Sequence, residues 1–172
     1  FQSGLSWSTI LKKREAFRTA FASFIPEAVA AFTDQDRERL IQDAGIVRNK
    51  RKIDAAITNA QATITLRSVL AAEGDAHRAG RMEEAPLAQL LRPRQSYPRH
   101  LGELVWLYQP SQHPLPKNAG EVPAQTEESR ALSAELKRRG FVFVGPVTAL
   151  ALMSAIGIVN TDILGTWKRP SN

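Results

Sequence analysis

The most constraining feature of the sequence is a glycine-containing turn near its end, in the stretch FVFVGPVTALALMSAIG that begins at Phe141. The segment before it, TEESRALSAELKRR, has Thr126 as a candidate N-cap and stops at Gly140. Pro146 suits the first position of the next helix, whose residues are apolar all round. The pattern therefore predicts a helix, a tight hairpin turn and a buried helix.

The first 70 residues are dominated by apolar residues at helical spacing. N-caps, helix-start prolines and this periodicity predict helices at about residues 6–24 (capped by Ser6 or Ser8), 26–32, 34–44 and 51–70. A short apolar helix is expected in GELVWLYQP, from Gly102. No segment alternates regularly enough to predict a strand, so the expected fold class is all-α.

Two segments lack this periodicity. Residues 71–101 are polar and rich in arginine and proline, and we interpret them as a variable surface excursion with one or two helical turns. Residues 111–125 form a proline-rich loop, of a length that is often functional. We expect one helical domain over residues 1–172, with residues 126–165 carrying the hairpin.

The charge of the chain favours a polyanionic partner. The net charge is +6 and the pI is about 10.1, which suits nucleic acid or a membrane surface, although solubility alone is the alternative explanation. Lys137, Arg138 and Arg139 stand directly before the turn, and we favour them as neighbours of DNA phosphates. Residues 48–52 are a weaker candidate, because basic runs are more often solvated surface. With no cysteine, disulfides and thiol catalysis are excluded.

The turn itself is a candidate phosphate site. Gly145, just before the last helix, allows close approach of a ligand to the main chain. The unpaired N–H groups of a helix start bind anions. Many helical hairpins use glycine only to turn, so this feature alone leaves both interpretations open.

Four blocks in consistent order extend this interpretation to a family. They read QSGLSWSTILKKREAFRTAF, LIQDAGIVRNKRKIDAAITNA, ALSAELKRRGFVFVG and FVFVGPVTALALMSAIGIVNTD. Together they resemble the 3-methyladenine DNA glycosylase I family of the helix-hairpin-helix DNA glycosylase superfamily, over about residues 2–70 and 102–165. The resemblance implies the helix-hairpin-helix glycosylase fold and an enzyme of base-excision repair. Such an enzyme flips the damaged nucleotide and hydrolyses the N-glycosidic bond of 3-methyladenine.

The resemblance also implies roles for individual residues. Trp7 forms a wall of the base pocket, where its face attracts a cationic methylated base, whereas without the resemblance a core position is the more ordinary interpretation. Gly4 and Leu5, with Gln2 beside them, approach the DNA and fill the gap that the flipped base leaves. A hydrophobic staple of the first helix is the alternative for Leu5. The hairpin residues that contact DNA are Phe143, Val144 and Gly145.

Two positions bear on the reaction. Bifunctional relatives carry a lysine where this chain has Val147, so we expect no lyase activity through a Schiff base. The catalytic aspartate of many superfamily members corresponds to Asn160, a weak catalytic candidate that could instead orient the local backbone. Asp162 is a further residue that could assist.

The resemblance implies features that the sequence lacks. The zinc ligands of many family members fall on residues 162–166, where Asp162 and Thr166 replace histidine and cysteine, so we expect no zinc and no other cofactor. The family's glutamate and tyrosine of the base pocket would lie before Phe1, and we therefore expect the natural chain to continue upstream.

The expected partner is double-stranded DNA with alkylated bases, bound by a monomeric cytoplasmic protein without a membrane segment, associated with the nucleoid if bacterial. Two alternatives stay open. One is a non-catalytic relative that binds damaged or bent DNA, and the other is a glycosylase for a different alkylated purine.

Overall fold

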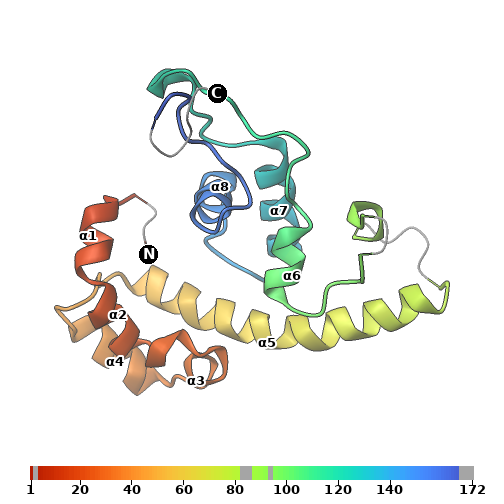
Figure 1. Cartoon of the computed structure of the whole chain (residues 1–172). Helices are drawn as coiled ribbons and strands as arrows, with labels where there is room; N and C mark the ends of the chain where they lie inside the picture. The colour runs from red at the N-terminus through yellow and green to blue at the C-terminus, as the bar shows by residue number, and fades with distance from the viewer. Residues whose placement is uncertain (2–3, 82–86, 93–94, 167–172) are drawn as a thin grey trace. The chain divides into compact units, whose positions relative to one another are not determined.

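The computed structural model describes residues 1, 4–81, 87–92 and 95–166, and every regular element within these ranges is a helix (Figure 1). This confirms the all-α fold class. The helices are α1 (Trp7–Lys12), α2 (Arg14–Ala20), η1 (Ala22–Phe24), α3 (Pro26–Ala30), α4 (Asp34–Gln42), α5 (Lys50–Arg78), η2 (Ala88–Leu90), α6 (Leu101–Trp106), η3 (Ala119–Glu121), α7 (Glu127–Arg138) and α8 (Pro146–Ala155).

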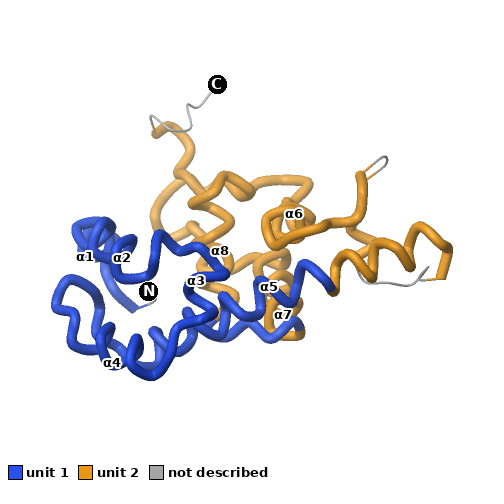
Figure 2. The backbone as a smooth tube through the Cα atoms, turned by 90° about the horizontal axis from the view of Figure 1, so that it is seen from below, with its two compact units in different colours: residues 1–68, 139–143 blue, residues 69–138, 144–172 orange. Residues whose placement is uncertain are grey.

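The chain divides into two compact units (Figure 2). Unit 1 comprises residues 1–68 and 139–143, and unit 2 comprises residues 69–138 and 144–172. The long helix α5 contributes its residues up to Ser68 to unit 1 and the remainder to unit 2. Within the described ranges, no helix is long and apolar enough to cross a membrane.

The first predicted helix is broken, which corrects the expectation of one helix up to Phe24. Ser6 does cap α1, because its side chain accepts a hydrogen bond from the N–H of Thr9 at 3.2 Å. The break falls at Lys13, whose ammonium donates to the carbonyls of Ala44 at 2.9 Å and Gly45 at 3.2 Å. A second break follows α2, where residues 22–24 adopt positive φ angles. The long-range hydrogen bonds of Lys13 thus coincide with the first break in a continuous helical pattern.

The core of unit 1 gathers aromatic and aliphatic side chains from α2, α3, α4 and α5. Its fully buried members include Phe21, Leu40, Ile53 and Ile57. The rings of Phe17 and Phe21 stack with their centroids 6.2 Å apart, and both belong to this cluster. The apolar period predicted from the sequence thus marks much of this core, whereas two residues of that period, Phe24 and Ile64, are exposed.

Helix α4 begins with a capping box. The side chain of Thr33 accepts from the N–H of Asp36, and the Asp36 carboxylate accepts from the N–H of Thr33 at 2.9 Å. This backbone hydrogen bond, together with one from the Thr33 hydroxyl, lowers the pKa of Asp36 below its ordinary value. The helix ends at Gln42, before Gly45.

The lowered pKa of Asp36 predicts a pH-dependent contribution to stability. A carboxyl with a lowered folded pKa stabilises the fold above its unfolded pKa, and this contribution is lost as the pH falls through the folded value. We expect Asp36→Asn to lower the free energy of unfolding near neutral pH and to lower it less at an acidic pH below the folded pKa of Asp36. Urea denaturation of both proteins at the two pH values measures this. An equal difference at both values would contradict the assignment.

Helix α5 continues to Arg78, beyond the expected end near Leu70, so the first residues of the predicted surface excursion are helical. Contacts within unit 2 support these last turns. The hydroxyl of Tyr97 donates to Glu73 at 2.8 Å, and the rings of Tyr97 and His77 lie 5.6 Å apart between centroids. Tyr97 is buried. Tyr97 thus contacts two residues of these last turns, Glu73 and His77.

Unit 2 is built around the predicted hairpin helices, since α7 packs against α8. Thr126 caps α7 as expected, with its hydroxyl accepting from the N–H of Ser129 at 3.2 Å. Gly140 and Gly157 follow the two helices with φ angles of 86° and 82°, the left-handed conformation that favours glycine. The buried side chains of α7, α8 and the segment after them include Leu132, Leu136, Leu150, Met153, Ile158 and Val159.

Candidate DNA-binding and base-recognition residues

The N-terminal candidates lie at the surface of unit 1. Gly4 has a φ of 75°, and a Cβ added there would meet no described atom within 4 Å. Leu5 is half-buried, and Gln2 lies outside the described residues. Trp7 is the first residue of α1 and is 50% exposed. The alternative of a core tryptophan is therefore wrong, and the indole is available to a ligand.

The hairpin candidates, residues 143–145, lie directly before the first residue of α8. Gly145 is the N-cap of α8, with Pro146 in its first turn. Its φ of −73° is open to any residue, and a Cβ added to it would meet no described atom within 4 Å. Neither backbone conformation nor packing of the described chain thus requires glycine here. A glycine at such a place leaves the first N–H groups of the helix open to an anion.

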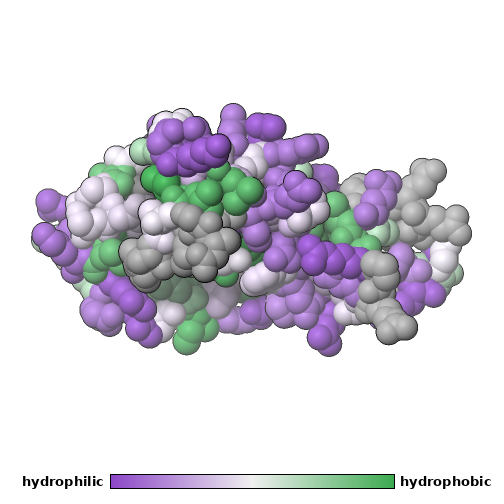
Figure 3. All heavy atoms as spheres, turned by 45° about the horizontal axis from the view of Figure 1, so that its top comes forward, coloured by the Kyte–Doolittle hydropathy of each residue, from purple (hydrophilic) through white to green (hydrophobic). Residues whose placement is uncertain are grey.

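Phe143 precedes this helix start and belongs to unit 1. It has a φ of 59°, unusual for a bulky residue, and is 49% exposed. Val144, in unit 2, accepts a hydrogen bond on its carbonyl oxygen from the hydroxyl of Ser133. Apolar side chains reach the molecular surface in several places, interrupted by hydrophilic ones (Figure 3), and Phe143 and Trp7 are among the large exposed hydrophobic residues.

The three basic residues before the turn differ in their surroundings. Lys137 is exposed at the end of α7. Arg138 instead forms a forked ion pair with Glu135, through Nε at 2.9 Å and Nη2 at 2.7 Å. Hydrogen bonding to this carboxylate, which is only 7% exposed, raises the pKa of Arg138 above its ordinary value. Arg139 is half-buried. Lys137 is thus exposed, Arg138 is exposed but paired with Glu135, and the DNA contacts of all three stay predictions.

Asn160 takes part in local backbone hydrogen bonds in unit 2. Its side-chain oxygen accepts from the N–H of Asp162 at 2.8 Å, and its own N–H donates to Nδ1 of His113 at 3.3 Å. This geometry agrees with the alternative that Asn160 orients the backbone, and its catalytic role stays a prediction. The partner His113 lies in the proline-rich loop, where nothing in the sequence pattern pointed to Asn160.

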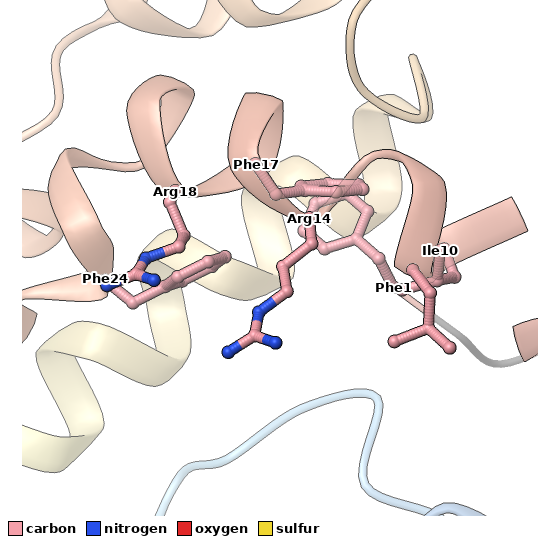
Figure 4. Close-up of a pocket in the computed structure, with 7 residues that line it drawn as sticks. Phe1, Ile10, Arg14, Phe17, Arg18 and Phe24 are labelled. Carbon is pink, nitrogen blue, oxygen red and sulfur yellow. The ribbon is translucent and has the colours of Figure 1, made fainter. Parts of the chain in front are cut away.

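A hollow of about 400 Å³ in unit 1 was not predicted (Figure 4). Its lining is mostly apolar, with two arginines: Phe1, Ile10, Leu11, Arg14, Phe17, Arg18 and Phe24. The rings of Phe1 and Phe17 lie together, 4.7 Å apart between centroids. The helical spacing of the aromatic residues was visible in the sequence, but the positive φ angles at residues 22–24, which place Phe24 here, were not.

The structure thus groups the candidates by unit. Gly4, Leu5 and Trp7 are close along the chain in unit 1. Lys137, Val144 and Gly145 occupy the adjoining ends of α7 and α8 in unit 2, whereas Asn160 lies beyond the opposite end of α8. The absence of a zinc ion or another cofactor stays a prediction.

Comparison with known proteins gives a consistent result. The sequence profile of the methyladenine glycosylase family matches residues 1–74 and 84–169. The chain is 36% identical to DNA-3-methyladenine glycosylase 1 of Escherichia coli (strain K12) over 173 residues, which covers 99% of this chain and 78% of that protein. It is 32% identical to the DNA-3-methyladenine glycosylase of Haemophilus influenzae, with coverage of 94% and 74%.

Solved structures agree in fold. A crystal structure of 3-methyladenine DNA glycosylase I superposes with a TM-score of 0.75 at 33% identity, covering 98% of this chain and 79% of that chain. A variant of such a glycosylase in complex with 3-methyladenine superposes with a TM-score of 0.72 at 27% identity, covering 99% and 78%. The expected glycosylase fold is thereby confirmed.

Proposed function

The chain belongs to the methyladenine glycosylase family, and from this premise we propose that it is a DNA-3-methyladenine glycosylase of base-excision repair. The observation that carries the proposal is Trp7, a large aromatic side chain held half exposed at the start of a capped helix. An indole face that is open to solvent can stack on a base, which is the role that the family resemblance implies for Trp7.

The reaction is a hydrolysis at C1′ of the damaged nucleotide. Adenine methylated at N3 carries a positive charge in DNA, so the bond between C1′ and N9 breaks with release of the neutral base. Water adds to C1′ and loses its proton to solvent, which leaves an abasic site. Because the leaving group is already activated, little acid catalysis is needed, and selection of the cation is the harder task. The face of Trp7 contributes roughly 0.5–2 kcal/mol to that selection through cation–π attraction.

We propose that duplex DNA is held by the start of α8 and by the N-terminal segment. Gly145 leaves the first turn of α8 open to a phosphate, Lys137 adds positive charge, and Leu5 fills the gap left by the flipped base. Such binding weakens steeply with salt. The protein acts as a monomer without a cofactor, in the cytoplasm and on nucleoid DNA if bacterial.

The enzyme is monofunctional in this proposal. Val147, the second residue of α8, is 60% exposed, and its aliphatic side chain offers no amine for a Schiff base. The DNA strand therefore stays intact after base release, and it breaks only when the abasic site is treated with alkali.

A lesion profile tests the proposal. Duplex DNA methylated at several ring nitrogens is incubated with the protein, and the free bases are identified by chromatography while strand breaks are followed on a gel. We expect 3-methyladenine to be released in preference to other methylated purines, without strand breaks. Preferential release of another purine would support the shifted-substrate alternative. Retention of every base on bound DNA would support the non-catalytic one.

A further inference from the structure

The side chain of Asn59 forms hydrogen bonds with both main-chain groups of Val142, a residue of the hairpin segment. Asn59 lies on α5, and its Oδ1 accepts from the N–H of Val142 at 2.8 Å. Its Nδ2 donates to the carbonyl of the same residue at 3.0 Å. Both residues belong to unit 1, although 83 positions separate them in the sequence. The carboxamide thus forms the same two hydrogen bonds with the main chain of Val142 that a residue of an adjacent β-strand would form.

Phe143, which follows Val142, has a backbone conformation that hydrogen bonds of this kind would stabilise. Phe143 has a φ of 59°, in the left-handed region that bulky residues rarely adopt, and half of its side chain is exposed. Packing of the phenyl ring therefore does not explain the conformation. On the other side of Phe143, the carbonyl of Val144 accepts from the hydroxyl of Ser133, which is 1% exposed on α7. The side chains of Asn59 and Ser133 thus form hydrogen bonds with the main chain on both sides of Phe143.

The turn leads directly to the open helix start. Val142 and Phe143 are followed by Val144 and by Gly145, the N-cap of α8. The direction of the first N–H groups of α8 depends on the backbone that enters the helix. A substitution that removes the carboxamide of Asn59 removes both of these hydrogen bonds to Val142.

We propose that Asn59 is a positioning residue for DNA binding: its carboxamide holds Val142 so that the turn presents the start of α8 to a DNA phosphate. The inference rests on the proposed function, because it concerns the same DNA contact. Asn59 itself touches neither base nor sugar in this account, so it acts on affinity for the duplex and leaves the bond-breaking step unchanged.

The test compares Asn59→Ala with Gln61→Ala. Gln61 lies on the same helix and donates from Nε2 to the carbonyl of Ala30 at 3.3 Å, so its loss removes a contact of the same kind with a different segment. Binding to an undamaged duplex and single-turnover base release are measured at a temperature where both variants are folded. For Asn59→Ala we expect about tenfold weaker duplex binding and a maximal release rate within about twofold of the original. Gln61→Ala should change neither.

Asn59→Asp is a second variant for the case that the alanine variant unfolds. Its carboxylate still accepts from the N–H of Val142 but opposes the carbonyl, so duplex binding should again weaken while the helix keeps a side chain of equal size. Duplex affinity like that of Gln61→Ala in the folded Asn59 variants would overturn the inference. If the unaltered protein releases no base, the proposed function fails, and the duplex affinities still decide the role of Asn59.

Discussion

We expect replacement of Trp7 by alanine to slow the release of 3-methyladenine about 5- to 150-fold under single-turnover conditions, since stacking on an aromatic side chain contributes roughly 1–3 kcal/mol per base. The effect falls on the chemical step as well as on binding, because the flipped base is held by stacking while its bond breaks. Trp7 is half exposed at the start of α1, so its removal leaves no cavity in the core. The melting temperature should change little.

Trp106→Ala is the matched control. Trp106 ends α6 in unit 2 and is 46% exposed, close to the 50% of Trp7. Its loss removes a similar area of exposed indole, yet no role in base recognition is assigned to it. We expect an unchanged rate of base release. Equal rates of base release for the two alanine variants would show that Trp7 is not part of the base pocket.

Gly145→Asp separates stability from DNA binding. Aspartate is a favourable N-cap, and its side chain would enter open space at the start of α8, so the helix should be as stable as before or more so. The same carboxylate stands where a phosphate is proposed to bind. Repulsion between like charges at an interface costs several kcal/mol, so duplex binding should weaken by at least about 30-fold. Thermal denaturation and fluorescence anisotropy with a labelled duplex measure the two effects.

Gly145→Asn shows which part of the effect is electrostatic. Asparagine has nearly the same shape and is an equally good N-cap, but it carries no charge. We expect it to bind DNA better than the aspartate variant and less well than the original protein, because its side chain still obstructs the approach of a phosphate. Equal affinity of all three proteins would place the phosphate elsewhere.

Much of the hairpin could be predicted from local sequence. Thr126 caps the start of α7, Gly140 follows its end with a positive φ, and Pro146 is the first residue of α8. Each of these residue types is favoured at the position that it occupies. The break at Lys13 could not be predicted, because its hydrogen-bond partners lie 31 and 32 residues further along the chain. The last turns of α5 were missed for the same reason, since Tyr97 supports them from 24 residues away.

The candidate site residues likewise divide into those that the sequence indicated and those that only the folded structure reveals. The resemblance to the family singled out Trp7, but periodicity could not distinguish an exposed indole from a buried one, and the structure decides for exposure. Glu135 stands three residues before Arg138, a visible helical pair, yet only the fold reveals that the carboxylate is buried. Asn59 gave no signal because its partner Val142 becomes adjacent only in the folded chain.

Whether the protein is a glycosylase is decided by measuring two products of one reaction. Protein expressed from its complete reading frame is incubated with duplex DNA that contains 3-methyladenine, and free base and abasic sites are quantified over time. We expect equal amounts of free base and abasic sites at every time point. DNA that is bound while neither product forms would show that the protein uses this fold for binding alone.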